Sequence, residues 1–281
     1  MEKQKILYPK MILVDLDGTL LNSKKEIGDK DWNTLIKLGS EGIIRVFATG
    51  RTLYSAMKVL DSSTPFDYLV FSSGAGIVDW HTNKVIYSET LNISQISETE
   101  NILRKLEVNF AIQLPIPENH KYYFHKSKKS NTDFEWRNDL YKKYSFKLNS
   151  SYPLQQATQF LVILEDEKEF EVVKSKIPNL KVIRATSPID GKSIWLEIFP
   201  ENISKASGGK YLCDMLNISE QDTIGIGNDY NDIDLLKWTH KSFAVANSPE
   251  IIKKMFSICI DNENNPLSDV LEQLKRDDVH S

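Results

Sequence analysis

Short apolar runs alternate with segments of helical periodicity in the first third of the chain. Residues 11–14 form a continuous apolar run, which is typical of a strand buried in a parallel sheet, and residues 43–48 and 68–71 are predicted to be further strands. Between them, residues 29–38 and 53–60 space their apolar side chains as a helix does. The pattern predicts successive strand–helix units.

The last third of the chain resumes the same alternation. Strands alternating with helices of this length indicate a parallel sheet with helices on both faces, so the expected fold class is α/β with a Rossmann-like core. The predicted helices are residues 205–216, 231–238, 249–255 and 266–274, and the predicted strands are residues 223–226, 243–246 and 258–260.

The middle of the chain differs in pattern and is richer in aromatic and charged residues. It predicts a separate α+β domain over residues 82–198, inserted into a core made of residues 1–81 and 199–281. Insertions of this kind belong at loop tips on the functional edge of a sheet. The predicted strands are residues 122–124, 160–164 and 194–198, and the predicted helices are residues 94–106 and 168–176.

Length and composition narrow the class of protein. The chain has 281 residues, 41% of them hydrophobic and 26% charged, which suits a globular protein of two domains. The net charge of −4 argues against a nucleic-acid partner, and no apolar stretch approaches the ~20 residues of a membrane span. The N-terminus lacks the apolar segment of a signal peptide, so we expect a cytoplasmic protein without a membrane partner.

Two carboxylates follow the first predicted strand directly. Asp15 and Asp17 are two residues apart, so their side chains leave the strand end on the same side. Ligands of open parallel sheets bind beyond the carboxyl ends of the strands, and close carboxylates attract a divalent cation. Gly18 permits a tight turn and Thr19 can donate to an anion. A surface turn with two solvated acids is the alternative, which the preceding apolar run disfavours.

Phosphate-binding groups are predicted at two further places. Thr49, Gly50 and Arg51 end the second strand, where they offer a hydroxyl, an approachable backbone and a bidentate donor. Lys205, at the start of a predicted helix, could neutralise phosphate charge in a transition state. Each signal is weak alone, because Thr-Gly-Arg also starts helices and lone lysines are usually solvated.

The fourth motif follows the strand at residues 223–226. It places Asn228, Asp229, Asn231 and Asp232 within five residues, and such oxygen-rich clusters suit magnesium. The alternative is a turn in which Asn231 or Asp232 caps the next helix.

The ordered set of these motifs resembles the haloacid dehalogenase superfamily, specifically its Cof-type (type IIB) sugar-phosphatase branch, over essentially the whole chain. In that branch a large cap domain is inserted between the second and third motifs, so the resemblance implies that residues 82–198 are an α+β cap that selects the substrate. That branch usually has Asp in the fourth motif where this chain has Asn228, followed by Asp229. Either residue could ligate the metal, and we favour Asn228. Ser73 stands where the family places an Asn after the third strand.

A mechanism follows as a hypothesis. Asp15 attacks phosphorus and becomes phosphorylated, and Asp17 protonates the leaving alcohol and then deprotonates water. The resemblance implies Mg²⁺ held by Asp15, by Asp17 through its main-chain carbonyl, and by the fourth motif. Thr49, Gly50 and Lys205 would bind phosphate, and Arg51 and Arg184 would bind substrate.

The expected partner is a small phosphorylated metabolite, which the resemblance suggests is a sugar phosphate, and the oligomeric state is left open. Two alternatives remain. A phosphomutase or phosphotransferase of the same superfamily would pass the phosphoryl group to a sugar hydroxyl instead of water. A sugar-phosphate sensor would bind its ligand and hydrolyse it poorly.

Overall fold

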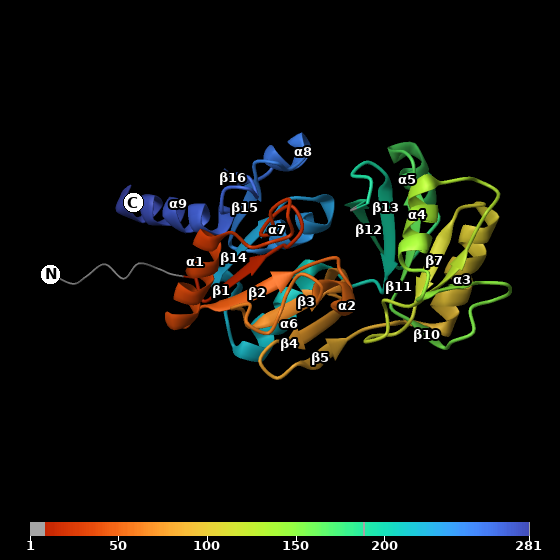
Figure 1. Ribbon diagram of the computed structural model, residues 1–281, viewed down its shortest axis with the longest axis horizontal. Coiled ribbons are helices and arrows are strands. Elements are labelled where there is room, and N and C mark those ends of the chain that lie inside the picture. The colour runs from red at the N-terminus through yellow and green to blue at the C-terminus, as the bar shows by residue number, and fades with distance from the viewer. Residues whose placement is uncertain (1–8, 188, 281) are drawn as a thin grey trace. The chain divides into compact units, whose positions relative to one another are not determined.

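The computed structural model describes residues 9–187 and 189–280, with side chains described as far as residue 276, and separates into two compact units. The first unit contains the chain up to Arg51, then Ala56–Ile86, and then the segment from Lys205 onward. The second unit contains Thr52–Ser55 and Tyr87–Ser204. The chain therefore leaves the first unit, builds the second, and returns (Figure 1).

An eight-stranded sheet forms the centre of the first unit, in the order β16-β15-β14-β1-β2-β3-β4-β5. The neighbours from β16 through β3 are parallel, and β4 then runs antiparallel to β3. The predicted α/β fold with a parallel-rich sheet is confirmed. The strands are β1 (Met11–Val14), β2 (Ile44–Ala48), β3 (Tyr68–Phe71), β4 (Gly76–Asp79), β5 (Lys84–Ser88), β14 (Thr223–Gly227), β15 (Lys241–Val245) and β16 (Ser257–Cys259).

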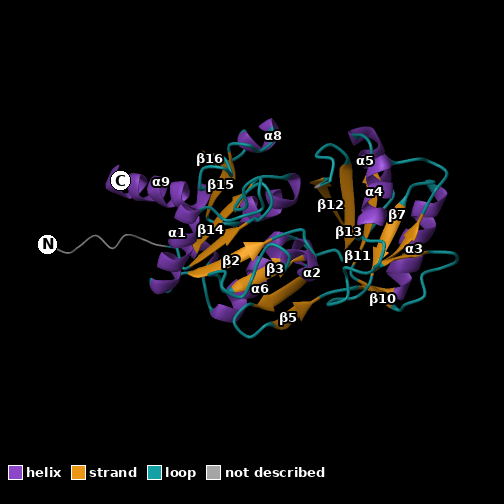
Figure 2. Ribbon diagram, viewed as in Figure 1, coloured by secondary structure: helices purple, strands orange, loops and turns teal. Residues whose placement is uncertain are grey.

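Helices cover this sheet on both sides, as Figure 2 shows. All four residues of β1 are at most 1% exposed, which requires cover over both faces of the strand. Helix α1 packs against α9 and β2, whereas α6 packs against α7 and β3. The helices of the first unit are α1 (Asp29–Ser40), α6 (Lys205–Leu216), α7 (Ile233–Trp238), α8 (Glu250–Lys253) and α9 (Pro266–His280), with short 3-10 turns η1 (Ser72–Gly74), η2 (Glu220–Asp222) and η3 (Tyr230–Asp232). Helix α2 (Leu53–Ala56) belongs to the second unit apart from its last residue.

The second unit is built on a six-stranded sheet in the order β12-β13-β11-β7-β8-β9. Neighbouring strands are antiparallel, apart from the parallel pair β8–β9. The strands β6 and β10 form a separate, short antiparallel pair. The strands are β6 (Leu91–Asn92), β7 (Phe110–Gln113), β8 (Tyr122–His125), β9 (Ser145–Lys147), β10 (Gln156–Ala157), β11 (Gln159–Leu164), β12 (Lys181–Thr186) and β13 (Ile194–Phe199).

Besides most of α2, the described part of the second unit contains the helices α3 (Ile93–Lys105), α4 (Thr132–Leu140) and α5 (Glu167–Lys174). Side chains of α3 and α5 share one apolar core with alternate residues of β7, β11 and β13, including Phe110, Phe160 and Leu196. Phe134 of α4 packs in a different cluster, with Leu161 of β11. Because neighbouring strand residues point to opposite faces, α4 covers the face that α3 and α5 do not.

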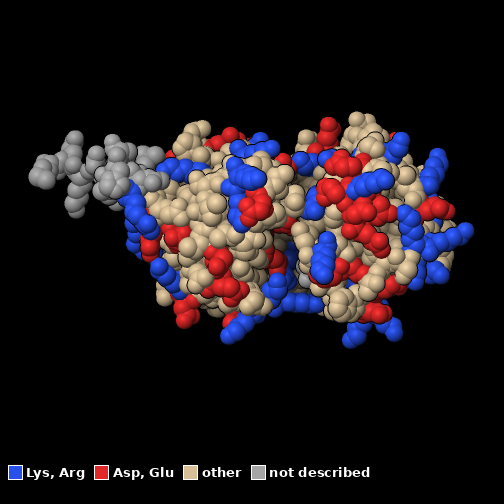
Figure 3. Space-filling view, turned by 90° about the horizontal axis from the view of Figure 1, so that it is seen from above, with Lys and Arg blue, Asp and Glu red and all other residues tan. Residues whose placement is uncertain are grey.

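Acidic and basic side chains are interspersed over the surface that Figure 3 displays. In the part of the chain that the structure describes, no helix has both the length and the apolar character needed to cross a membrane.

Candidate active site

Four neighbouring strands of the first unit end at the same edge of its sheet. Asp15 follows β1, Thr49 follows β2, Ser72 follows β3 and Asn228 follows β14. The strands are parallel and adjacent in the order β14-β1-β2-β3, so their carboxyl ends meet. The structure therefore brings together residues that lie more than two hundred positions apart in the sequence.

Lys205 joins two carboxylates at this edge. Its Nζ donates to Asp15 Oδ1 at 2.6 Å and to Asp232 Oδ1 at 2.6 Å, and lies 3.5 Å from Asn231 Oδ1. Lys205 and Asp232 are fully buried, and Asp15 is 4% exposed. A buried cation between two acids is stabilised only when its hydrogen bonds are satisfied, as they are here.

The approach of helix α6 to the sheet sets the position of Lys205, its first residue. A Cβ atom on Gly208 would lie 2.5 Å from Val70 Cγ1, and one on Gly209 would lie 2.8 Å from Leu13 Cδ2. Only glycine allows this close contact between the helix and strands β1 and β3. The two glycines thus let the first turn of α6 reach the strand ends.

Burial and charge shape the protonation of this trio. Burial, together with the charge of Asp232, raises the pKa of Asp15 to about 7, against the opposing attraction of Lys205. Burial disfavours the charge of Lys205, but the carboxylates of Asp15 and Asp232 outweigh it and raise the lysine pKa above its usual value. Lys205 is therefore a permanent cation beside Asp15.

Asp232 also organises the turn after β14. Its second oxygen, Oδ2, accepts hydrogen bonds from the main-chain N–H groups of Asn228 at 2.9 Å and Asp229 at 3.0 Å. A single carboxylate thus connects Lys205 to the backbone of the fourth motif. The alternative that Asp232 caps the following helix is met in part. Asp232 is the N-cap residue of α7 but makes no side-chain capping bond to it, whereas the hydrogen bond from Asp229 belongs to a capping box at the start of the short turn η3.

The side chain of Asn228 lies against the turn that follows β1. A Cβ atom on Gly18 would lie 2.5 Å from Asn228 Nδ2, and Asn228 Oδ1 accepts a hydrogen bond from Thr19 Oγ1 at 3.2 Å. The main-chain carbonyl of Gly18 accepts from Asn247 Nδ2 at 2.8 Å, and Gly18 has φ +76°. The first and fourth motifs are therefore in direct contact through an amide side chain.

Asp17 is held by two cations. Arg51 donates to both of its oxygens, from Nε at 2.5 Å and from Nη2 at 2.7 Å, and Lys25 Nζ donates at 3.0 Å. Burial acts to raise the pKa of Asp17, but the contacts with Arg51 and Lys25 outweigh it and lower the pKa below its usual value. The structure thus presents Asp17 as an ionised carboxylate and Arg51 as its ion-pair partner.

Hydroxyl and amide groups surround Gly50. A Cβ atom there would lie 3.3 Å from Asn231 Nδ2 and 3.5 Å from Ser73 Oγ. Thr49 is 1% exposed, and its Oγ1 accepts from the main-chain N–H of Arg51 at 3.1 Å, which leaves its own hydroxyl proton to donate. These polar groups gather at the strand ends where the sequence predicts phosphate binding.

Ser72 and Ser73 both adopt left-handed backbone conformations, with φ of +48° and +53°, although neither is glycine. Both are completely buried, and their main-chain N–H groups donate to the carbonyls of Arg51 and Thr49 at 2.8 and 3.0 Å. Strained backbone of this kind persists only where its surroundings demand it, and it gathers at functional sites.

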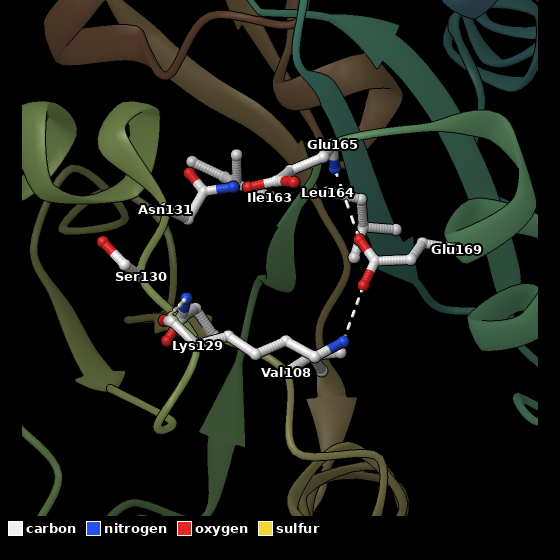
Figure 4. Close-up of a pocket in the computed structure, with 9 residues that line it drawn as sticks. Val108, Lys129, Ser130, Asn131, Ile163, Leu164, Glu165 and Glu169 are labelled. Atoms are coloured by element: carbon white, nitrogen blue, oxygen red, sulfur yellow. Dashed lines mark hydrogen bonds and ion pairs between the residues drawn. The ribbon is translucent and has the colours of Figure 1, made fainter.

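Arg184 lies on β12 in the second unit, where its Nε donates to Glu167 Oε2 at 3.1 Å. Its predicted role in substrate binding stays a prediction. A pocket of about 300 Å³ also lies in this unit, between the segments that precede α4 and α5, and an ion pair of 2.7 Å joins Lys129 to Glu169 in its wall (Figure 4). None of the described residues that line this pocket belongs to the four motifs, so the pocket is separate from the strand-end site.

The predicted site residues did not include Asp232, Asn231 or Ser73, although the first two belong to the fourth motif. Asp232 is the most important of these, because it anchors both Lys205 and the turn after β14. The clustering of two Asp and two Asn residues was visible in the sequence, but the pattern does not say which of them points inward. The only indication for Ser73 was its position after the third strand, where the family places an Asn.

A family model described as haloacid dehalogenase-like hydrolase matches residues 12–271. The chain belongs to this family. The resemblance stated from its motifs is thereby confirmed, and so is the prediction that it is an enzyme of the haloacid dehalogenase phosphatase type.

Curated relatives of this family member span nearly the same length. A putative phosphatase of Bacillus subtilis, YxeH, is 25% identical over 263 residues, covering 87% of this chain and 90% of the relative. The 5-amino-6-(5-phospho-D-ribitylamino)uracil phosphatase YcsE of the same organism is 23% identical, with 87% of each chain covered.

Solved structures of haloacid dehalogenase phosphatases share the fold. The phosphatase BT1666 from Bacteroides thetaiotaomicron gives a TM-score of 0.79 at 18% identity, covering 98% of both chains. The subclass IIB sugar phosphatase BT4131 gives a TM-score of 0.74 at 17% identity, covering 95% of this chain and 99% of its own.

Proposed function

We propose that the enzyme is a magnesium-dependent phosphatase that hydrolyses small phosphorylated metabolites, sugar phosphates in particular, through a phosphorylated Asp15. The observation that carries this proposal is the contact of 2.6 Å between Asp15 and the buried Lys205 at the strand ends. The names of YcsE and of BT4131 as phosphatases of a ribitylamino compound and of sugars support the choice of substrate class.

In the first step, an oxygen of Asp15 attacks phosphorus and the bond from phosphorus to the leaving alcohol oxygen breaks. Lys205, Thr49 and the N–H groups around Gly50 bind the phosphoryl oxygens and offset their charge. In the second step, water attacks phosphorus and the bond to Asp15 breaks, which releases phosphate and restores the carboxylate.

Asp17 moves the protons in both steps. As a carboxylate held by Arg51, it is ready to accept the proton of the attacking water in the second step. To donate a proton to the leaving alcohol in the first step, it must first leave the ion pair and take up a proton from solvent, which the loss of the Arg51 contact favours because that contact lowers its pKa. We assign that release to Arg51, whose bidentate guanidinium can exchange the carboxylate for an oxygen of the substrate.

The residues present fit a magnesium ion, although their oxygen ligands carry less negative charge than a site of several carboxylates would. Within the described ranges, no three His, Cys, Asp or Glu side chains gather to hold a metal. The candidate ligands are the Asp15 carboxylate, the Asp17 main-chain carbonyl and the amide oxygen of Asn228, an all-oxygen set. We choose Asn228 over Asp229 because its side chain lies against Gly18. A bound magnesium ion would offset the negative charge of the phosphate.

The test is the release of inorganic phosphate from an aryl phosphate, with magnesium or with a chelator, by the wild-type enzyme and by Asp15→Asn. We expect release that needs magnesium and that falls more than about 1,000-fold in the variant, because the nucleophile is lost. Asp29→Asn, at an exposed position in α1, is the matched control and should behave as the wild type does.

Each other outcome has a distinct meaning. An Asp15→Asn rate close to that of the wild type would refute the covalent mechanism. Appearance of the phosphoryl group on an added sugar, without free phosphate, would replace hydrolysis by phosphoryl transfer. Tight binding of sugar phosphates without turnover would indicate a sensor.

A further inference from the structure

The second unit buries an arginine that forms no ion pair with a described carboxylate and has one donor nitrogen without an acceptor. Arg137, on α4, is 5% exposed, and its Nη1 has no hydrogen-bond acceptor in the described structure. No described carboxylate forms an ion pair with it, and Nη2 lies 3.3 Å from the side-chain oxygen of Gln113 in that amide's favourable orientation. A buried guanidinium is always charged, so it is costly unless an anion or equivalent acceptors face it.

The natural partner on the same helix is occupied elsewhere. Asp133 precedes Arg137 by four residues, the spacing at which acidic and basic side chains pair on a helix surface. Both oxygens of Asp133 are already in use, because Oδ1 accepts from Ser187 Oγ at 3.1 Å and Oδ2 accepts from Trp195 Nε1 at 2.7 Å. The charge of Asp133 acts on Arg137, but the two side chains form no described hydrogen bond, and Nη1 of Arg137 is left without an acceptor.

Three aromatic rings surround the guanidinium. Its Cζ lies 4.1 Å from the ring centre of Tyr122, 5.6 Å from that of Tyr141 and 5.7 Å from that of Trp195. Rings at these distances stabilise a cation and also exclude water, which strengthens any charge-assisted hydrogen bond formed there.

Two of these rings are held in place by α4 itself. The Tyr122 hydroxyl donates to Asn138 Oδ1 at 3.0 Å, and Trp195 donates to Asp133. Trp195 and Tyr141 are half-buried, so solvent reaches the edge of the group. The cluster is preorganised before any ligand binds, which lowers the entropic cost of binding.

We propose that Arg137 is the centre of an oxyanion-binding site in the second unit, which takes a phosphate or carboxylate group of a small molecule. The guanidinium supplies charge and the donor Nη1, and the rings supply a dry, cation-stabilising wall. Because every contact that defines it lies in the second unit, the site does not depend on the proposed phosphatase mechanism.

The test uses the full chain labelled with 5-fluorotryptophan and observed by fluorine NMR. The chain has five tryptophans, so the Trp195 resonance is identified by its loss in Trp195→Phe. Sodium phosphate and sodium malonate are titrated separately at constant ionic strength. We expect a saturable shift of the Trp195 resonance, at least 10-fold weaker binding in Arg137→Lys, and no saturable shift in Arg137→Met.

The two anions identify the ligand chemistry. A saturable shift with phosphate alone supports a phosphate group, one with malonate alone supports a carboxylate, and one with both supports a general oxyanion site. Arg276→Met, which removes an exposed arginine, should bind as the wild type does. The proposal is overturned if neither anion gives a saturable shift, or if the shift survives unchanged in Arg137→Met. Should Arg137→Met not fold, unchanged affinity in Arg137→Lys overturns it.

Discussion

Lys205 is at once a predicted phosphate-binding group and a structural one. It lies without solvent exposure between Asp15 and Asp232, so it neutralises two acids that would otherwise repel each other in a medium of low polarity. Asp232 also accepts two main-chain hydrogen bonds from the turn after β14, so it connects Lys205 to that turn. The same charge therefore stabilises the fold and prepares the site for an anion.

Removing that charge should be costly. We expect Lys205→Met to lower the free energy of unfolding by about 3–5 kcal/mol at neutral pH, because it leaves two buried acids without a cation. Urea unfolding followed by circular dichroism measures the change. Lys25→Met is the control, since Lys25 is half exposed in its ion pair with Asp17 and should contribute less than about 1 kcal/mol. Equal costs for the two variants would contradict the structural role of Lys205.

Gly18 and Gly42 provide a matched pair for the contact between the first and fourth motifs. Their φ angles are +76° and +77°, but an added Cβ atom meets Asn228 only at Gly18 and meets nothing within 4 Å at Gly42. Alanine should cost about 1 kcal/mol at either position through backbone strain. We expect Gly18→Ala to lose further stability and most of the phosphatase activity, whereas Gly42→Ala keeps its activity. Equal activity in the two variants would show that the position of Asn228 does not matter.

At the scale of single residues, the sequence predicted the convergence of Asp15, Thr49 and Lys205, because apolar runs located the strands they follow or neighbour. It did not predict the bidentate pair of Arg51 with Asp17, since ion pairing depends on side-chain directions that spacing alone does not contain. Nor did it predict the buried Arg137, because the sequence analysis predicted no helix in the segment that forms α4.

At the scale of elements, the buried strands were the easiest to predict. The expected strands at residues 11–14 and 68–71 have the same bounds in the structure. Both strands lie inside the sheet and are covered on both faces, so their sequences are continuous apolar runs that are easy to recognise. The expected helix at residues 53–60 ends at Ala56 instead. Val59 and Leu60 both donate to the carbonyl of Ala56, which tightens the segment into a turn that apolar spacing could not reveal.

The edge strand β5 and its neighbour β4 were not predicted, for a related reason. β5 has no buried residue, so its sequence carries no clear signal of burial. β4 follows the strained turn at Ser72 and Ser73, which reverses the chain so that β4 pairs antiparallel with β3. A reversal by non-glycine residues in left-handed conformations has no common sequence signature.

An ion pair holds two strands together at the end of the sheet where they begin. Arg45 of β2 donates to Asp67, the residue before β3, from Nε at 2.9 Å and Nη2 at 2.7 Å. Burial acts to raise the pKa of Asp67, but the hydrogen bonds from Arg45 and His81 outweigh it and lower the pKa. The folded state therefore prefers the ionised form of Asp67.

This preference sets the sign of a pH effect. A lowered carboxyl pKa stabilises the fold above the unfolded pKa of about 3.9, and the stabilisation is lost as pH falls through the lower folded pKa. We expect Asp67→Asn to cost about 1–3 kcal/mol at pH 7 and progressively less below about pH 4. Unfolding by urea across this range measures it, beside the exposed Asp29→Asn. A cost that does not change with pH would contradict the assignment.

At the scale of the whole molecule, two compact units share one chain, and each has its own sheet and core. The inserted position of an α+β unit was predictable from the change in residue pattern after the third strand. Its bounds were less so, because residues 82–86 and 199–204 continue strands or loops without a change in composition. The role of the second unit as a substrate-selecting cap stays a prediction.

Separate cores imply separate folding. We expect residues 87–204, produced alone, to fold with the helix and strand content they have in the full chain, because one apolar cluster unites α3, α5 and the six-stranded sheet. Cooperative thermal unfolding and dispersed amide NMR signals would establish this. A fragment without cooperative unfolding would show that the second unit depends on the first.

The central strand β1 has one partner, β2, that is made soon after it and another, β14, that is made only after the second unit. On the ribosome, β1 through β5 are therefore synthesised while one side of β1 still lacks its partner β14. At that stage the chain contains Asp15 but neither Lys205 nor Asp232. The second unit has already left the exit tunnel when β14 arrives. The nucleophile Asp15 is thus synthesised long before its counter-ion Lys205. A nascent chain stalled before Lys205 would contain the first motif, with Asp15 and Asp17, and yet be inactive.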